Sequence, residues 1–440
     1  MRVRDYCRFM FFGVSFNLNR NQRKNADGRA EVSMDIEVLR SLAREYAQIA
    51  LSEKCSKRIE RFCDLNEKKI VRPPVLVFEA PWGEIGKVEC VCGDERCREM
   101  EWNLRAELFQ FKHFEGDYAV SPYYKSDIAL NNSGIGIESR EKIIGSSTGS
   151  GISAHEYEDV LPDDDALDTL KMPVITIDEK KTEKDRALAL EVFDGILPVR
   201  LGGQGLYLAS WDRIARYHGV NNSLCDLYDR PEFIHRMMEK FTQIQESIID
   251  RYEELNVLDG DALYLHCTPA VTRELPRKNT GVDKVTAKDV WVRAMAQIFA
   301  VVSPEMHEEF DLLYTKRLFD RCGLSYYGCC EPLDNKIDKL RQFGNLRRIS
   351  ISAWANVEAA AEKIDGDYVF SYKPNPAFVA GSSFDPEPVR REITRVLEAC
   401  RKNNTPCEFI LKDISTVNND YTRLTKWVET ANSVIDNYFA

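Results

Sequence analysis

Side chains that could act as acids or bases stand directly after short apolar runs of this 440-residue sequence. Glu79 follows one such run, Lys373 follows another, and Lys412 and Asp413 follow the last. A buried lysine or carboxylate needs an ion pair or a ligand, and groups of this kind gather at functional sites. We therefore expect the acid and base groups of an active site among Glu79, Glu331, Lys373, Lys412 and Asp413. A structural ion pair is the competing interpretation of Lys412.

Two adjacent cysteines and a glutamate form the second chemical signal, in the segment 326–333. Side chains two residues apart on an extended segment share a face, which predicts that Cys329 and Glu331 point together and that Cys330 faces the other way. Thiolates and carboxylates are ligands of Zn²⁺. Cys330, Glu331 and Cys329 are therefore candidate metal ligands. Two small hydrophobic side chains buried at the end of a strand are the alternative.

Aromatic and polar residues follow the same runs, and we expect some of them to bind a substrate. The candidates are Trp82, Tyr124, His266, Trp354 and Asn375. His266 could equally be a hydrogen-bonded residue of the protein wall, since histidine is common in both roles.

Eight apolar runs must position these residues, and each has the residue pattern of a buried parallel strand. They cover residues 75–78, 118–120, 196–199, 262–265, 324–327, 348–352, 368–371 and 409–411. Amphipathic stretches at 232–255, 355–364 and 387–402 predict helices between strands. This alternation predicts an α/β protein, a (β/α)8 TIM barrel with its chemistry at the carboxyl ends of the strands. A doubly wound sheet is the alternative, but the glycines at 202–205 lack the third glycine of a dinucleotide-binding loop.

The chain divides into three parts on the same patterns. Residues 1–33 precede the first helical periodicity and are expected to be a disordered or mis-started extension. Residues 34–70 predict N-terminal helices, and residues 71–440 form the barrel, with an irregular insertion at about 131–185 after strand two. Such a loop more often shapes the substrate site than the fold.

Composition excludes several classes of protein. The chain has 60 Lys and Arg against 71 Asp and Glu, a net charge of −11, which disfavours a nucleic-acid partner. No apolar segment is long enough to span a bilayer. Thirteen irregularly spaced cysteines indicate free thiols in a reducing compartment, and we expect a cytoplasmic protein.

Several motifs, taken in chain order, resemble the uroporphyrinogen decarboxylase-like superfamily, and particularly its bacterial branch of corrinoid-related methyltransferases. The resemblance covers about residues 35 to 440 and rests on 72–74, 211–215, 303–306, 327–331, 350–354, 373–376 and 411–416. It implies a TIM barrel that demethylates a small O- or N-methylated compound and passes the methyl group to cobalamin on a separate corrinoid protein. The decarboxylases have an arginine-rich segment after strand one. Residues 78–84 contain no arginine here, so we do not expect uroporphyrinogen as the substrate.

The zinc methyltransferases of this superfamily have a His-x-Cys pair after strand five and a second cysteine after strand eight. The matching positions hold Gly328 and Cys330, or Cys329 and Glu331, and no cysteine stands near residues 414–415. The resemblance therefore implies at most a remodelled zinc site, with His266 or His307 as a third ligand.

Two other functions stay open at this point. A metal-free lyase or decarboxylase could use the lysines and carboxylates at the strand ends on a carboxylated small molecule. A binding protein on a decayed barrel is the non-enzymatic alternative. The oligomeric state is left between a monomer and a homodimer.

Overall fold

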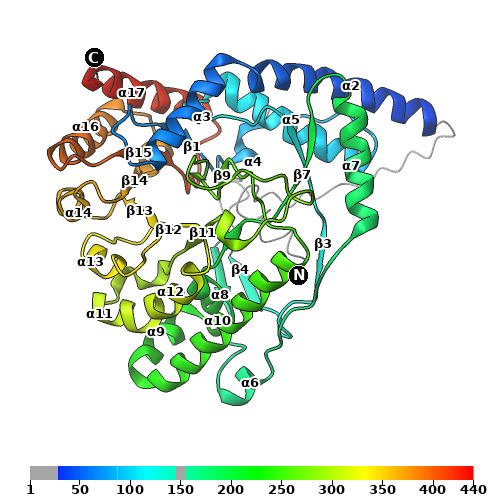
Figure 1. The fold of residues 1–440 in the computed structure, drawn as a ribbon. Coiled ribbons are helices and arrows are strands. Elements are labelled where there is room, and N and C mark those ends of the chain that lie inside the picture. The colour runs from blue at the N-terminus through cyan, green and yellow to red at the C-terminus, as the bar shows by residue number, and fades with distance from the viewer. Residues whose placement is uncertain (1–27, 87, 145–153, 440) are drawn as a thin grey trace.

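The computed structural model describes residues 28–86, 88–144 and 154–439, and its centre is a curled sheet of seven parallel strands (Figure 1). The strands are hydrogen-bonded in the order β1-β15-β14-β13-β12-β11-β8. In that order their bounds are β1 (Val75–Val77), β15 (Cys407–Leu411), β14 (Val369–Lys373), β13 (Leu346–Ser352), β12 (Leu324–Tyr327), β11 (Trp291–Ala294) and β8 (Leu206–Tyr207).

The expected eight-stranded barrel is not closed, because in the described part of the chain no hydrogen-bonded pairing joins β8 to β1. Residues 118–120 are not a strand, and the run at 262–265 contains β9 (Tyr264–Leu265), which pairs antiparallel with β10 (Thr268–Pro269). The run at 196–199 leads into β7 (Val199–Gly202), which pairs only with β2 (Tyr124–Asp127). The predicted closed barrel is therefore corrected to a curled, open sheet.

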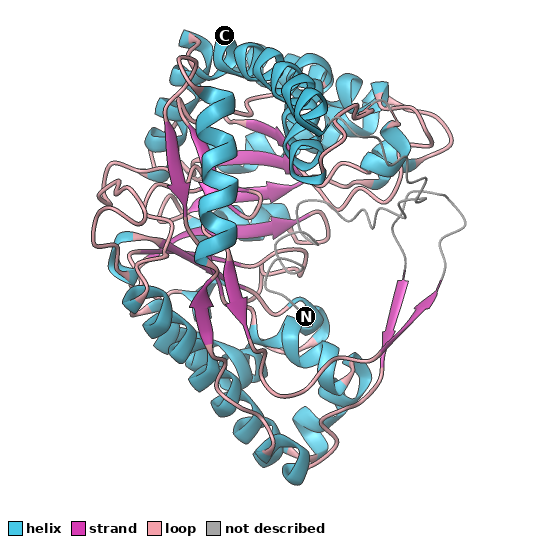
Figure 2. Ribbon diagram, turned by 90° about the vertical axis from the view of Figure 1, so that its right-hand side faces the viewer, coloured by secondary structure: helices cyan, strands magenta, loops and turns pink. Residues whose placement is uncertain are grey.

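Helices surround the sheet (Figure 2). They are α2 (Gly28–Ala50), α3 (Glu53–Asn66), α4 (Trp82–Ile85), α5 (Glu95–His113), α6 (Asp164–Asp168), α7 (Glu179–Phe193), α8 (Ser210–His218), α9 (Val220–Asp229), α10 (Pro231–Glu254), α11 (Pro304–His307), α12 (Leu313–Phe319), α13 (Ile337–Leu340), α14 (Val357–Ile364), α15 (Ala377–Ala380), α16 (Pro386–Lys402) and α17 (Thr422–Phe439). Short turns of other helix types are η1 (Ala287–Asp289), η2 (Gln297–Val301) and η3 (Glu308–Leu312). The helices predicted at 232–255, 355–364 and 387–402 are confirmed as α10, α14 and α16.

Short polar side chains set where helices begin. Asn356 caps α14 by accepting a hydrogen bond from the Ala359 amide, and Asp94 caps α5 by accepting from the amides of Arg96 and Cys97. Such caps satisfy amides that have no partner inside the helix.

The segment expected as an irregular insertion has regular structure of its own. It contains β4 (Glu141–Ile144) and β5 (Ala154–Tyr157), which pair antiparallel, and most of a second antiparallel pair, β3 (Leu130–Asn132) with β6 (Ile175–Ile177). At the other end of the chain, most of the expected extension at 1–33 lies outside the described residues. Helix α2 already begins at Gly28, ahead of the predicted start, and packs against α5 and α7.

The described cysteines are all free thiols. Within the described residues, none of the helices combines the length and apolar character that crossing a membrane requires.

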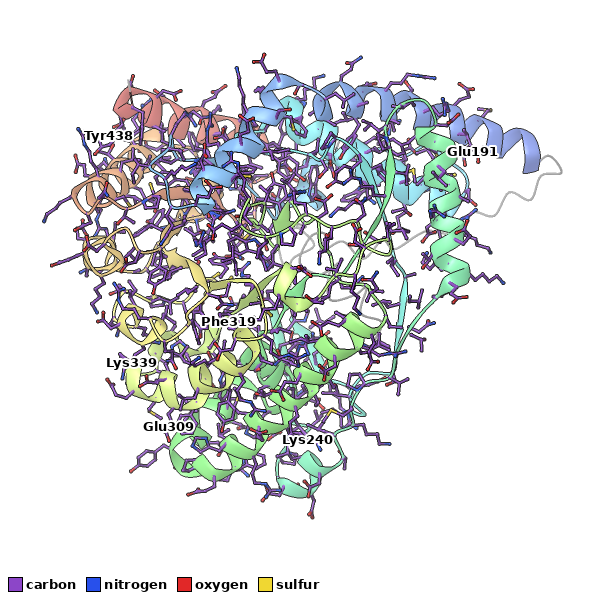
Figure 3. The ribbon with its side chains drawn as sticks, in the orientation of Figure 1. Glu191, Lys240, Glu309, Phe319, Lys339 and Tyr438 are labelled. Atoms are coloured by element: carbon purple, nitrogen blue, oxygen red, sulfur yellow. The ribbon has the colours of Figure 1, made fainter. Side chains whose placement is uncertain are left out.

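The central sheet has two chemically different faces, as side-chain alternation along a strand requires. The outer face is apolar: Ile349, Ile351, Phe370 and Phe409 belong to one hydrophobic core with residues of α14, α16 and α17. In Figure 3 the charged Lys339 and Glu309 lie at the periphery of the molecule and Phe319 lies further inside. The inner face is polar and carries Arg348, Ser350, Ser352, Ser371, Lys373 and Glu408, all of them buried.

A fully buried ion pair lies on this inner face. Arg348 Nη2 lies 2.5 Å from Glu408 Oε2, and neither side chain is exposed to solvent. The Ser371 hydroxyl donates to Glu408 Oε1 at 2.5 Å, and Arg348 Nη1 donates to Asn66 Oδ1 at 3.1 Å. These contacts join three strands of the sheet to the end of α3.

Removing one member of this pair should destabilise the protein strongly. Arg348→Met leaves the Glu408 carboxylate buried without its cation, which costs about 3–5 kcal/mol of unfolding free energy. The double variant Arg348→Met/Glu408→Leu should recover most of that loss, because neither charge then remains. Urea unfolding followed by circular dichroism measures both.

Arg341→Met is the matched control, because Arg341 pairs with Asp367 at the surface. A surface pair contributes about 0–1 kcal/mol. Equal losses for Arg341→Met and Arg348→Met would show that the buried pair does not anchor the sheet.

Candidate active site

The curl of the sheet brings the carboxyl end of β12 across to the ends of β1 and β15. Glu79 follows β1, and Lys412 and Asp413 follow β15, its hydrogen-bonded neighbour. Strand β12 is not adjacent to β15, yet Cys329, which follows β12, contacts Lys412. The carboxyl ends of parallel strands form the usual catalytic edge of such folds.

Lys412 is the centre of this cluster. Its buried ammonium group donates to Cys329 Sγ at 3.2 Å and lies 3.1 Å from Asp413 Oδ1 and 3.6 Å from Glu79 Oε2. The amide of Asp413 donates to Glu79 Oε2 at 3.2 Å. The sequence prediction that grouped Glu79, Lys412 and Asp413 thus corresponds to one set of direct contacts.

The two cysteines lie side by side, contrary to the expectation that they face opposite ways. Their sulfur atoms are 3.4 Å apart, and Cys330 Sγ also lies 2.7 Å from Asp413 Oδ2. The chain has left the extended conformation here, because Gly328 has a φ of 98°. A Cβ at Gly328 would meet Leu333 Cδ1 at 2.5 Å, so this turn requires glycine.

The pKa values of the two thiols are shifted in opposite directions. The hydrogen bond from Cys330 lowers the pKa of Cys329 well below its usual range, and the charges of Lys412 and Arg293 lower it further against the effect of burial. The same contact and burial raise the pKa of Cys330. These shifts favour a thiolate at Cys329 and a protonated thiol at Cys330.

The pKa of the Glu79 carboxyl group lies near neutral pH. Burial raises its pKa to about 7, although the charge of Lys412 acts in the opposite direction. Its Oε1 lies 3.4 Å from His266 Nε2. Burial, together with the charges of Arg293 and two lysines, lowers the pKa of His266 well below its usual value, so the imidazole is neutral. A carboxyl group with these properties is suited to general acid catalysis near pH 7.

Three residues of the cluster have left-handed backbone conformations. Glu79, His266 and Asp413 have φ values of 54°, 57° and 56°. Residues other than glycine adopt this region at an energetic cost, and such strain gathers at functional sites. The backbone geometry thus supports the same location as the side-chain contacts.

Glu331 holds the turn that carries the cysteines. Its Oε2 accepts from the Cys329 amide at 3.0 Å, and its Oε1 accepts from the Ala296 amide at 3.3 Å. Burial, with the nearby Cys329 charge, raises its pKa to about 8. Lys373, another predicted site residue, is also buried on the inner face, where its ammonium group donates to Ser371 Oγ at 2.8 Å.

Two of the predicted substrate-binding residues pack among other aromatic side chains. The Trp82 ring meets the rings of Trp102 and Phe109 edge to face, and the Tyr124 ring stacks on Phe193 of α7 at 4.2 Å. Large aromatic contacts of this kind contribute packing energy. Neither contact belongs to the Lys412 cluster.

The other three predicted substrate-binding residues have different surroundings. Asn375 accepts from the Ala377 amide at 3.0 Å, in the turn just before the short helix α15. Trp354 is 70% exposed just beyond β13. Only His266 of these three contacts the cluster, through Glu79.

Sequence reasoning missed two residues near the cluster. Arg293 lies in β11, and its Nη1 approaches Cys267 Sγ at 3.6 Å. Burial raises the pKa of Asp212 to about 6, and its Oδ2 accepts from Gln297 Nε2 at 2.9 Å. The only sequence signal for Asp212 was its place in the motif 211–215, to which no role had been assigned.

The donors do not fit a zinc site. Among the residues that the structure describes, no group of three or more His, Cys, Asp or Glu side chains could hold a metal ion. Both oxygens of Glu331 are used by backbone amides, and His307 is buried in a contact with the Tyr327 hydroxyl at 2.6 Å. We therefore assign no step of the reaction to zinc.

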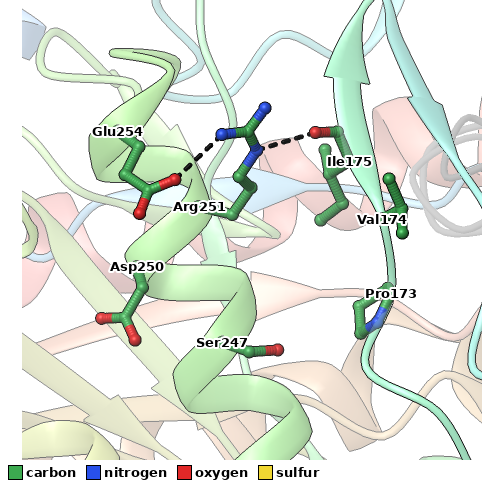
Figure 4. A pocket seen from close by; sticks show the side chains of 7 residues that line it. All are labelled: Pro173, Val174, Ile175, Ser247, Asp250, Arg251 and Glu254. Atoms are coloured by element: carbon green, nitrogen blue, oxygen red, sulfur yellow. Dashed lines mark hydrogen bonds and ion pairs between the residues drawn. The ribbon is translucent and has the colours of Figure 1, made fainter.

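A surface depression of about 380 Å³ lies elsewhere, between α10 and β6 (Figure 4). Arg251 crosses it, donating to the Ile175 carbonyl at 2.8 Å and pairing with Glu254. No residue of the Lys412 cluster lines this depression, so it does not compete as the active site.

The thiolate assignment predicts an unusual titration. Cys329 should ionise well below the ~8.5 of an ordinary cysteine, because its thiolate is stabilised by a hydrogen bond and two cations. The difference in ultraviolet thiolate absorbance between the native chain and Cys329→Ser, followed against pH, measures this. Lys412→Met should move the midpoint upward, and Lys363→Met, a partly exposed lysine of α14 that pairs with Asp338, should leave it unchanged. A midpoint at the ordinary value in the native chain would contradict the assignment.

Comparison with known proteins gives a likeness of fold. No family model matches the sequence, and no curated protein is significantly similar to it. Among solved structures, a methyltransferase from Methanosarcina mazei superposes with a TM-score of 0.50 at 10% sequence identity, covering 87% of this chain and 99% of that chain. At this identity the likeness concerns the fold, a TIM-like α/β arrangement whose sheet is open here.

Proposed function

We propose that the protein is a methyltransferase that demethylates a small O- or N-methylated compound and passes the methyl group to a corrinoid protein. The fold likeness to the methyltransferase from Methanosarcina mazei supports this class of activity, as do the motifs that resemble the corrinoid-related methyltransferases. The acceptor, cobalamin, would arrive on its own carrier protein. The free thiols among the described cysteines accord with a reducing, cytoplasmic setting.

The observation that carries the proposal is the Glu79 carboxyl group, which lies 3.6 Å from the buried ammonium group of Lys412. When the bond from the methyl group to oxygen or nitrogen breaks, its electron pair stays on the leaving atom, which must take up a proton. Glu79, with a pKa raised to about 7 by burial, holds that proton near neutral pH. Reduced cobalamin supplies the nucleophile that accepts the methyl group.

A second candidate is a metal-free lyase or decarboxylase acting on a carboxylated small molecule. Lys412, buried between Glu79 and Asp413, favours it, because a cation in that place can stabilise charge that develops on a substrate. The two candidates give different products, methylcobalamin in one case and carbon dioxide in the other.

Glu79→Gln should lower the rate of methyl transfer by about 10²–10⁴-fold, because the amide cannot donate the proton. The native rate should fall as pH rises above about 7, since Glu79 then loses its proton, and the variant should lack this decline. The assay measures methylcobalamin formed from reduced free cobalamin and a panel of methanol, trimethylamine, dimethylglycine, methoxyacetate and 4-methoxybenzoate.

The matched control is Glu89→Gln, an exposed glutamate in the same part of the chain. It should retain the native rate and pH profile. Carbon dioxide release from the two carboxylated methyl ethers without methylcobalamin would favour the lyase. Full activity in Glu79→Gln would remove Glu79 from the mechanism.

A further inference from the structure

Two buried cations near the Lys412 cluster have no carboxylate partner. Arg293 is fully buried, and its guanidinium group donates to the Gly328 carbonyl at 3.1 Å and approaches Cys267 Sγ at 3.6 Å. Lys373 is 4% exposed and donates to Ser371 Oγ at 2.8 Å. No ion pair joins either cation to a carboxylate of the described residues. Buried charges without a counter-ion are strongly unfavourable, so this pair calls for an anion.

Both cations lie against the same aromatic ring. Arg293 Cζ is 4.6 Å and Lys373 Nζ is 5.4 Å from the centroid of the Tyr326 ring. The charges of both also reach His266, which contacts Glu79. The unpaired cations therefore adjoin the proposed active site.

Hydrogen-bond donors without acceptors surround the same place. Tyr326 Oη, Ser352 Oγ, Arg293 Nε and His266 Nδ1 are buried, and none has a hydrogen-bond partner. Ser352 faces Lys373 across the pairing of β13 with β14. Buried polar atoms are nearly always satisfied in folded proteins, and each of these four atoms can donate a proton to an acceptor.

The charge at this place fits an anion with one negative charge. Asp413 balances the charge of Lys412, and the Cys329 thiolate balances one of the two charges of Arg293 and Lys373. One positive charge is then left over from Arg293 and Lys373 together. A single carboxylate matches that charge, and its two oxygens can accept several hydrogen bonds at once.

Building on the proposed function, we propose that Arg293, Lys373 and Ser352 bind the carboxylate of the substrate, which is a small methylated carboxylic acid. Depth in the site gives the orientation. Arg293 and Lys373 are buried, whereas the side chains of Glu79 and Asp413 are 21% and 45% exposed. The carboxylate lies at the inner end, and the methyl group lies toward Glu79 and the opening, where a corrinoid protein can approach.

Calorimetric binding to the full chain tests this without relying on turnover. The probes are methoxyacetate, dimethylglycine and 4-methoxybenzoate, each compared with its neutral amide, with inorganic phosphate as a competing anion. At least one acid should bind about tenfold or more tightly than its amide, since the amide loses the charged contacts. Failure of every acid to bind more tightly than its amide, or tighter binding of phosphate than of all three acids, would overturn the proposal.

Substitutions test which residues bind the carboxylate of the acid. Lys373→Met and Ser352→Ala should each weaken the tightest acid, the first by about tenfold or more. Lys363→Met should bind it as the native chain does, and melting temperatures identify any variant that has lost its fold. Unchanged affinity in Lys373→Met would place the acid elsewhere and overturn the proposal.

The proposed methyl transfer and the proposed carboxylate site can be tested independently of each other. Glu79→Gln should still bind the acid, because Glu79 lies at the other end of the substrate. Binding of the acids without any methylcobalamin would leave the carboxylate site standing and refute the methyl transfer. Methyl transfer from neutral donors alone, without binding of the acids, would support the methyl transfer and refute the carboxylate site.

Discussion

Charge on the inner face of the curled sheet is the constraint on which the rest of the structure depends. A parallel sheet covered on both faces normally carries apolar side chains, yet β13, β14 and β15 present arginine, lysine, glutamate and serines inward. Arg348 and Glu408 balance each other's charge deep inside, and Asn66 ties Arg348 to α3. Nearer the strand ends the positive charges outnumber their partners, and the chemistry of the molecule begins there.

The behaviour of the cluster follows from two opposing effects on each group. Burial disfavours any charge, whereas Lys412 favours negative charge on its neighbours. At Cys329 the contacts with Lys412 and Cys330 outweigh burial, because both side chains touch the sulfur atom, and the pKa of Cys329 is lowered. At Glu79 burial outweighs the charge of Lys412 and raises the pKa, because Glu79 lies 3.6 Å from the ammonium group and shares it with Asp413. One lysine thus yields a thiolate and a protonatable carboxyl group side by side.

The sequence predicts part of this arrangement well. Apolar runs identified β1, β12, β13, β14 and β15, and reading the residue after each run located Glu79, Lys412 and Asp413. Strand β11 was missed, and Arg293 interrupts the apolar run of this four-residue strand. That arginine is buried by the curl of the sheet, which is a property of the assembled fold and not of the local sequence.

The orientation of the cysteines was wrong for a related reason. The alternation rule holds only while the chain stays extended, and the positive φ of Gly328 ends that conformation just before the pair. Trp82 and Tyr124 were expected to bind substrate because they follow strands, but a position after a strand does not distinguish a side chain that faces the opening from one that packs under a helix. Only contacts between distant segments make that distinction.

The strained backbone at Glu79, His266 and Asp413 connects these points. A side chain that continues the direction of its strand would point along the sheet edge, whereas the contacts with Lys412 and Cys330 require the chain to turn inward at once. A left-handed residue makes that turn in a single step, at a cost that the surrounding fold must hold in place. The β1–β15 pairing provides this restraint, because it fixes the residues just before Glu79 and Asp413 in register. The rigid sheet therefore stabilises a backbone geometry that an isolated loop would not keep, and that geometry places an acid, a thiolate and a cation within contact of one another.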